Sequence, residues 1–140
     1  MATSPLAQER IMPRPATVIA SQGSPAAAAV LTKAAVRAAQ FLGLNNASLA
    51  RVVGLSESQI SRMAKGEKTI DPGSKPAELA ALLIRLYRSL DALVGNDDGQ
   101  RRAWMASYNR AFNAAPRDAV QKVDGLVRVV SYLDGARAMV

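Results

Sequence analysis

Residues 45–66 read NNASLARVVGLSESQISRMAKG, and this stretch decides the fold. Its first half has the apolar spacing of a short helix through Val53, and Gly54 follows as a turn residue that tolerates a positive φ. Ser56 and Gln59 have the spacing of a capping box, so a second short helix should begin there. The residues expected at the ends of the two helices are Asn45 or Asn46, Val53, Ser56 and Lys65.

The apolar residues of this stretch have the spacing of a helix-turn-helix. Ala50, Gly54 and Ile60 stand at the four- and six-residue separations of that motif, which needs a small residue at the helix crossing, a turn residue and an aliphatic anchor. A pair of short helices around a glycine turn also occurs in other helical proteins, but the complete set of matches favours the motif. The remaining buried positions would be filled by Leu49, Val53, Leu55 and Met63.

The exposed residues of the second helix are small polar side chains and cations, which suit contacts with base edges and phosphates. Glu57 departs from this pattern, because a carboxylate near the start of a recognition helix opposes phosphate, although it can accept a hydrogen bond from cytosine. A helix-turn-helix domain either binds DNA or serves only for dimerisation, and the sequence is compatible with both roles. The expected DNA contacts are Ser56, Ser58, Gln59, Ser61, Arg62, Lys65 and Lys68.

Helical spacing continues on both sides of the motif. Residues 1–25 contain four of the seven prolines and should form a flexible leader. Residues 26–42 repeat apolar residues at helical intervals, and the leucines of 76–94 form one broad apolar stripe. The expected organisation is a leader at 1–25, a helix-turn-helix domain at 26–75, a connecting helix at 76–95 and a second module at 96–140.

The second module should contain two further helices. The first is expected over 100–112 and would place Trp104, Tyr108 and Phe112 on one face, with Trp104 and Phe112 in the core of the module. Pro116 should then start a turn that leads into the last helix. The apolar residues expected on one face of that helix are Val120, Val123, Val127, Val130 and Leu133.

The composition limits both fold and function. Apolar residues make up 49% of the 140 residues and aromatic residues only 4%, which favours an all-α fold. The 18 Lys and Arg against 11 Asp and Glu give a net charge of +7, most of it in the middle of the chain, which suits a polyanionic partner. The absence of cysteine and histidine excludes disulfides, thiolate and imidazole chemistry and nearly every transition-metal site. With no membrane-spanning run and no signal peptide, we expect a soluble cytoplasmic protein.

Two parts of the chain resemble known families. Residues 31–75 resemble the Xre family of phage-repressor-like DNA-binding domains. Most of residues 80–140 resemble the Xre/MbcA/ParS toxin-binding domain, in which a tryptophan helix leads through an asparagine and a proline turn to a glycine-bearing helix. Asn113, Ala114 and Ala115 stand where members of that family often have a glycine. The second resemblance rests on Trp104, Asn109, Phe112, Pro116, Val120, Gly125, Val129 and Leu133.

This resemblance implies an antitoxin of a RES–Xre toxin–antitoxin system. In relatives of this architecture, the antitoxin forms a homodimer, represses its own operon and occludes the active site of a NAD-degrading RES toxin with its C-terminal region. The tail beyond Gly135 suits that role, because it should be unstructured alone and carries a cation. The implied partners are the RES toxin and operator DNA, with no membrane, metal or cofactor. The expected toxin contacts are Arg128, Tyr132, Asp134, Arg137 and Val140, although each cation could instead belong to a solvated helix face.

Two other functions remain to be weighed. The first is a stand-alone transcriptional regulator whose C-terminal part serves oligomerisation, and a neighbouring RES-type reading frame would separate it from an antitoxin. The second is an enzyme, which the sequence disfavours. Asp97 and Asp98 are adjacent on a loop rather than opposed across a cleft, while Ser56 and Ser61 lack a histidine or suitably flanked lysine to activate them.

Overall fold

The computed structural model describes residues 24–139, and this part of the chain confirms the expected all-α fold. It contains no β-strand in that range, only an isolated bridge between Asn109 and Ala114. Residues 1–23, which include nearly all of the expected leader, and Val140 lie outside the described residues. The helices are α3 (Pro25–Phe41), α4 (Asn46–Val53), α5 (Glu57–Ala64), α6 (Lys75–Val94), α7 (Asp98–Ala106), α8 (Pro116–Ala119) and α9 (Val123–Ala138).

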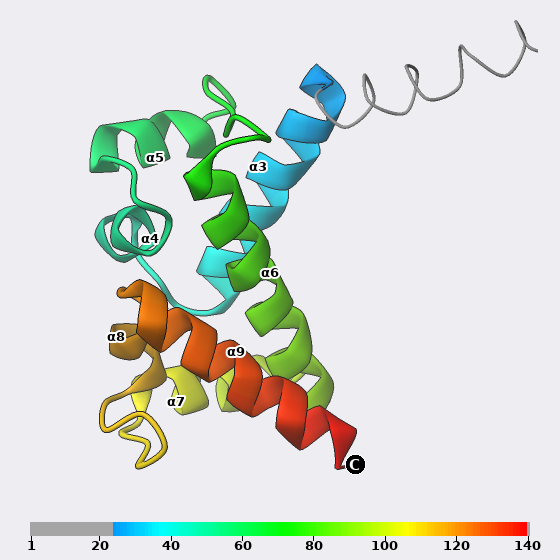
Figure 1. Ribbon diagram of the computed structural model, residues 1–140, viewed down its shortest axis with the longest axis vertical. Helices are drawn as coiled ribbons and strands as arrows, with labels where there is room; N and C mark the ends of the chain where they lie inside the picture. Colours follow the sequence, from blue (N-terminus) through cyan, green and yellow to red (C-terminus); the bar gives the residue numbers. More distant parts are fainter. Residues whose placement is uncertain (1–23, 140) are drawn as a thin grey trace, which may run out of the picture.

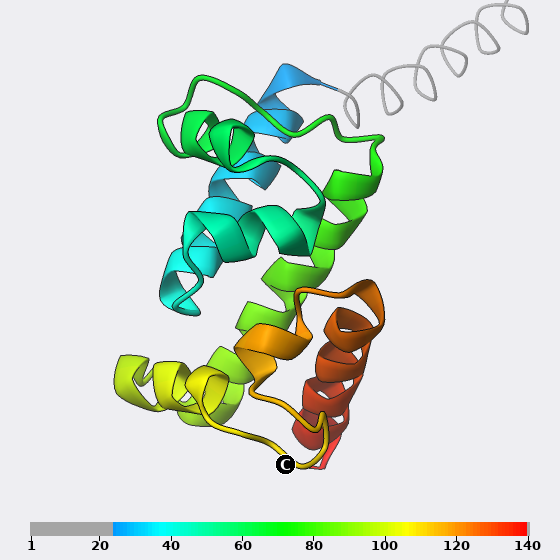
Figure 2. The same cartoon turned by 90° about the vertical axis from the view of Figure 1, so that its left-hand side faces the viewer.

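The long helix α6 organises the molecule. Its first half packs against α3 and α4, and α9 lies along it (Figure 1). Figure 2 shows α3, α4 and α5 grouped around one end of α6, and α7, α8 and α9 around the other. Buried apolar residues from both groups join in one continuous core, to which α6 contributes Leu83, Leu86 and Leu90. No helix within residues 24–139 is long and apolar enough to cross a membrane.

The helix-turn-helix forms where the sequence predicts it. The Asn45 side chain caps α4 by accepting a hydrogen bond from the Ser48 amide at 2.8 Å, and Gly54 ends that helix in the left-handed conformation with φ of 76°. Ser56 and Gln59 form the predicted capping box at the start of α5. Ile60, on the inward face of α5, is completely buried. Local signals in the sequence therefore place both helices and the turn between them.

The prediction of a helix over 100–112 is wrong in its second half, because α7 ends at Ala106. The Ser107 hydroxyl donates to the Ala103 carbonyl at 2.7 Å, and the Asn109 side chain accepts from the Ala111 amide at 2.9 Å. Such side-chain bonds to the backbone compete with helix continuation. Tyr108 is 64% exposed, so it does not belong to the core.

The predicted apolar face of the last helix is right for Val130 and Leu133, which are buried, but wrong for two of its valines. Val120 is buried but precedes α9, whereas Val123 and Val127 point outward with exposed fractions of 59% and 46%. A close approach between α8 and α9 sets this orientation, since a Cβ atom on Gly125 would lie only 1.9 Å from the Ala119 carbonyl oxygen. The residues that α9 buries are Gly125, Leu126, Val129, Val130 and Leu133.

The last helix continues further than predicted. We expected an unstructured tail from Gly135, but α9 runs to Ala138. The Asp134 carboxylate accepts from the Ser89 hydroxyl of α6 at 2.9 Å, and Arg137 donates to the same hydroxyl at 3.2 Å. These two bonds on either side of Gly135 fasten the final turn to α6.

Candidate functional site

The outer face of α5 carries the side chains expected to contact DNA. Ser58, Arg62 and Lys65 are exposed, and Ser61 is half-buried. Ser56 and Gln59 are engaged within the capping box, where the Ser56 amide donates to the Gln59 side-chain oxygen at 2.9 Å. The two predicted contacts at the helix start therefore shape its N-terminus, while Ser58, Arg62 and the C-cap residue Lys65 stay accessible and Ser61 is only partly so.

Lys68 lies on the loop that follows α5, and a buried contact fixes this loop. The Ile70 amide donates to the Thr32 hydroxyl of α3 at 2.8 Å, and that hydroxyl donates in turn to the Ala28 carbonyl at 2.7 Å. Glu57 is exposed in the first turn of α5, where a negative charge favours the helix dipole. The structure thus brings the predicted cations of α5 and its following loop to one end of the molecule.

The face of α9 that points away from the core carries the candidate toxin contacts. Tyr132 is 46% exposed, yet its ring stacks on Trp104 with 6.3 Å between centroids and meets the edge of Phe112 at 5.2 Å. Arg128 pairs with Asp124 at 3.2 Å on the open surface. Val123 and Val127 complete this face, and we call these four exposed side chains, Val123, Val127, Arg128 and Tyr132, the α9 surface.

The sequence reasoning placed the two valines of the α9 surface in the core. Their spacing of four residues was a correct signal for a shared helix face, but not for which face is covered. Asp134 and Arg137, by contrast, contact α6 within the same chain. Asp134 also pairs with Arg85 at 2.6 Å, so it is less available to a partner than the sequence suggested. Val140 lies outside the described residues.

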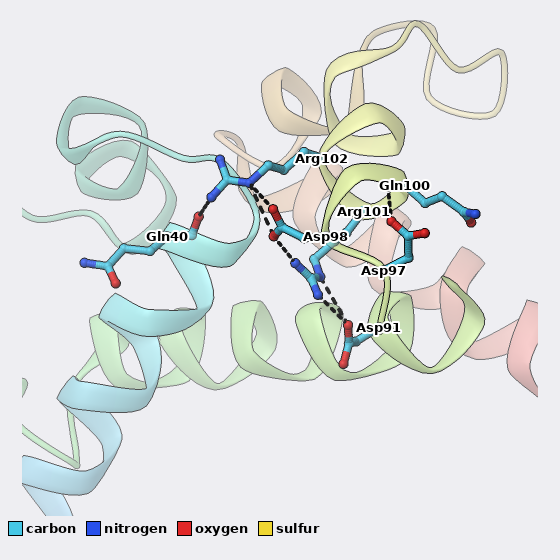
Figure 3. Close-up of polar contacts among 7 residues, drawn as sticks. All are labelled: Gln40, Asp91, Asp97, Asp98, Gln100, Arg101 and Arg102. Atoms are coloured by element: carbon cyan, nitrogen blue, oxygen red, sulfur yellow. Dashed lines mark hydrogen bonds and ion pairs between the residues drawn. The ribbon is translucent and has the colours of Figure 1, made fainter. Parts of the chain in front are cut away.

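A buried arginine, which the sequence reasoning missed, joins the two ends of the molecule. The Arg101 guanidinium lies 5.4 Å from the ring centre of Phe41 and 5.5 Å from that of Tyr87. It also forms ion pairs with Asp91 at 2.8 Å and with Asp98 at 2.6 Å (Figure 3). Burial by itself lowers its pKa, but the bonds to the two carboxylates and the charge of Asp91 outweigh burial and raise the pKa above its usual value. Arg101 therefore stays charged and connects α7 with α6 and α3.

Two further contacts reinforce this junction. Arg102 donates to the Gln40 carbonyl near the end of α3 at 2.9 Å (Figure 3). On the other side, Arg51 of α4 donates to the Gln121 side chain at 2.5 Å, and that side chain reaches Ser48 at 3.4 Å. The C-terminal helices are thus hydrogen-bonded to both α3 and α4, and the two candidate surfaces belong to one packed body.

Comparison with known protein families gives two consecutive matches. A family model described as the antitoxin Xre-like helix-turn-helix domain matches residues 21–85, and one described as the antitoxin Xre/MbcA/ParS C-terminal toxin-binding domain matches residues 89–138. A search of curated proteins gives no match. The first match contains α5 with its exposed cations, and the second contains the α9 surface. A helix-turn-helix domain followed by a toxin-binding domain is the arrangement that both the sequence and the fold display, and the chain belongs to the Xre/MbcA/ParS family of antitoxins.

Proposed function

We propose that this antitoxin neutralises a RES-type, NAD-degrading toxin and represses its own operon. The observation that carries the proposal is the presence of two different accessible surfaces on one core. The helix α5, with its exposed cations, lies toward one end of the molecule, and α9, with the α9 surface, lies toward the other (Figure 1). The first surface suits a polyanion, and the second suits a protein partner.

On the DNA side, we assign base contacts to Ser58, Ser61 and Arg62 and phosphate contacts to Lys65 and Lys68. An arginine on a recognition helix makes bidentate bonds to guanine, whereas lysines near the helix end neutralise phosphates. A two-fold homodimer would read two half-sites about one helical turn, or 34–36 Å, apart. Repression of the operon follows if such a site overlaps its promoter.

On the toxin side, we assign the main contact to the α9 surface. Val123 and Val127 lie one turn apart toward one edge of the outward face of α9. Tyr132, anchored on Trp104, lies toward the opposite edge with Arg128 beside it, so the α9 surface offers two apolar contact points with charged groups between them. Interfaces place aromatic and aliphatic side chains centrally, with polar groups around them. Nothing within the described residues lies within 4 Å of a Cβ built on the exposed Gly135, so a partner could approach the helix backbone closely there.

Because the end of α9 is helical, the active site of the toxin would be covered by a formed helix rather than by the unstructured tail expected from the sequence. The contacts to Ser89 hold Arg137 on a formed turn, so this residue would reach the toxin as part of a helix rather than of an extended tail. A preformed segment loses less conformational entropy on binding than a disordered one. We therefore propose that the last turn of α9 covers the NAD site of the toxin.

Copurification tests the toxin assignment. The tagged antitoxin is co-expressed with the protein of the adjacent reading frame, which the proposal expects to be of RES type, and the retained toxin is quantified. Val127→Asp places a charge on an apolar part of the α9 surface and should abolish retention. Val30→Asp is the matched control, because it changes an exposed valine of α3 and should leave retention unchanged. Equal retention by both variants would exclude the α9 surface, and no retention by the parent would exclude a RES partner.

A further inference from the structure

A basic groove lies between α3 and the end of α5. Its volume is about 470 Å³, and its walls are α3 on one side and the end of α5 with the following loop on the other. Four of the lining side chains are cations, and no carboxylate lines it; Glu67 is adjacent to Lys68 in sequence but is not part of the wall. The cations, which we call the groove cations, are Lys33, Arg37, Lys65 and Lys68.

The fold holds the groove cations in place from three directions. Lys33 and Arg37 are exposed on one face of α3 at a separation of four residues, about 6 Å along the helix axis. Lys65 is the C-terminal cap residue of α5. Lys68 lies on the loop that the hydrogen bond between Ile70 and Thr32 fastens to α3. The four charges therefore converge on one space rather than spread over the surface.

The groove cations have no ion-pair partner within residues 24–139. Five other cations of the same range do pair with carboxylates, namely Lys75, Arg85, Arg101, Arg102 and Arg128. Like charges at a spacing of four residues, such as Lys33 and Arg37, weaken a helix. A cluster of this kind is favourable when an anion neutralises it.

We propose that this groove binds the phosphate backbone of duplex DNA, so that α3 holds the DNA together with the recognition helix. The inference rests on the proposed DNA binding by α5 and extends it to Lys33 and Arg37. Lys65 is both a groove cation and part of the outer face of α5, which makes the two surfaces continuous. No aromatic side chain lines the groove. A site for single-stranded nucleic acid usually offers aromatic rings on which bases stack, so a duplex fits these walls better.

Salt-dependent DNA binding of the full chain tests the groove. The probes are a 30-bp duplex from the promoter of its own gene and a scrambled duplex of the same length. Each phosphate contact contributes about 0.9 to the slope of log affinity against log salt. The double variant Lys33→Gln with Arg37→Gln should therefore reduce the slope by about 1.8 on both duplexes and leave the preference between them unchanged.

The matched control removes the same charge elsewhere. Arg110 and Arg117 are exposed, on the loop before α8 and on α8 itself, and belong to the C-terminal helices rather than to α3 or α5. Their double replacement by glutamine should leave the slope as in the parent. If both double variants lower the slope equally, only net charge matters and the groove proposal is overturned. Far-UV circular dichroism should show the same helix content in all variants.

Four further results would overturn the groove proposal, and they differ in what they imply. If the parent binds neither duplex, DNA binding by the chain fails altogether. If Arg62→Gln loses promoter preference while the groove variant behaves as the parent, only the groove contact fails. If a 30-nucleotide RNA binds more tightly than the duplexes and loses affinity in the groove variant, the ligand of the groove is RNA rather than duplex DNA. If inorganic phosphate alone stabilises the parent while the groove variant binds duplexes as the parent does, the groove binds free phosphate and not DNA.

Discussion

Arg101 shows how one side chain can hold two parts of this molecule together. Its guanidinium lies beside the stacked rings of Phe41 and Tyr87, in contact with both, and is bonded to Asp91 and Asp98. Arg101→Ala should lower the free energy of unfolding by about 3 kcal/mol, the lower end for a broken buried ion pair because Asp98 remains open to solvent. Arg101→Lys should restore little of it, since an ammonium lacks the planar fork that stacks and bonds at once. Urea denaturation gives both values, and parental stability of Arg101→Ala would contradict this role.

Two glycines of α9 should respond oppositely to the same substitution. A Cβ on Gly125 would lie 1.9 Å from the backbone oxygen of Ala119, so Gly125→Ala must push α8 and α9 apart and should cost about 2 kcal/mol or more. A Cβ on Gly135 meets nothing within 4 Å, and Gly135→Ala should stabilise the helix by about 0.5–1 kcal/mol. Thermal unfolding of both variants checks the pair. A destabilised Gly135→Ala would mean that the end of α9 is not the exposed helix described here.

At the scale of the element, substitutions on α5 should distinguish a contact that recognises the base sequence from a contact that only neutralises phosphate charge. If Arg62 reads a base, Arg62→Ala should cost about 1–3 kcal/mol on the specific site and relax the sequence preference. Lys65→Ala should weaken binding to all duplexes alike and reduce the salt slope by about one. Gel-shift titrations at several salt concentrations distinguish the two effects. Unchanged operator affinity in both variants would exclude this face of α5.

The elements differ in how far the sequence could predict them. The starts and ends of α4 and α5 follow from Asn45, Gly54 and the capping box, which are local signals. The end of α7 depends on a loop whose Ser107 and Asn109 bond to the backbone, a choice that the apolar pattern does not reveal. The buried face of α9, the burial of Arg101 and the groove cations all depend on contacts between distant segments. The residues of α5 that we propose to contact DNA were therefore accessible to sequence reasoning, as were Arg128 and Tyr132 of the α9 surface, whereas the exposure of its two valines was not.

At the scale of the whole molecule, the two proposed binding surfaces share one core along α6. The junction through Arg101, Arg102 and Gln121 ties the toxin-binding domain to α3 and α4. If toxin binding moved α7, the contacts of α7 with α3 would change, and the position of the helix-turn-helix domain could change with them. If toxin binding does shift the affinity for the operator, linkage requires that the operator shift the affinity for the toxin by the same factor.

Removal of residues 135–140 should separate folding from neutralisation. Within the described residues, α9 buries nothing beyond Leu133, so the truncated chain should keep its fold and its DNA binding with only a small loss from the missing Arg137 contact. Toxin neutralisation should be lost or strongly reduced, and Arg137→Glu should reproduce part of that defect. Growth of cells that co-express the toxin reports neutralisation, and a gel shift serves as the folding control. Full protection by the truncated chain would place neutralisation on the α9 surface alone.

The most direct test is the NAD content of cells that produce the toxin of the adjacent reading frame, which the proposal expects to be of RES type. Co-expression of the parent chain should keep cellular NAD at the level of toxin-free cells. The Val127→Asp variant, produced at equal level and with unchanged circular dichroism and DNA binding, should let NAD fall as if no antitoxin were present. If NAD falls equally with the parent chain, or stays protected by Val127→Asp, then this protein does not neutralise a NAD-degrading toxin through α9.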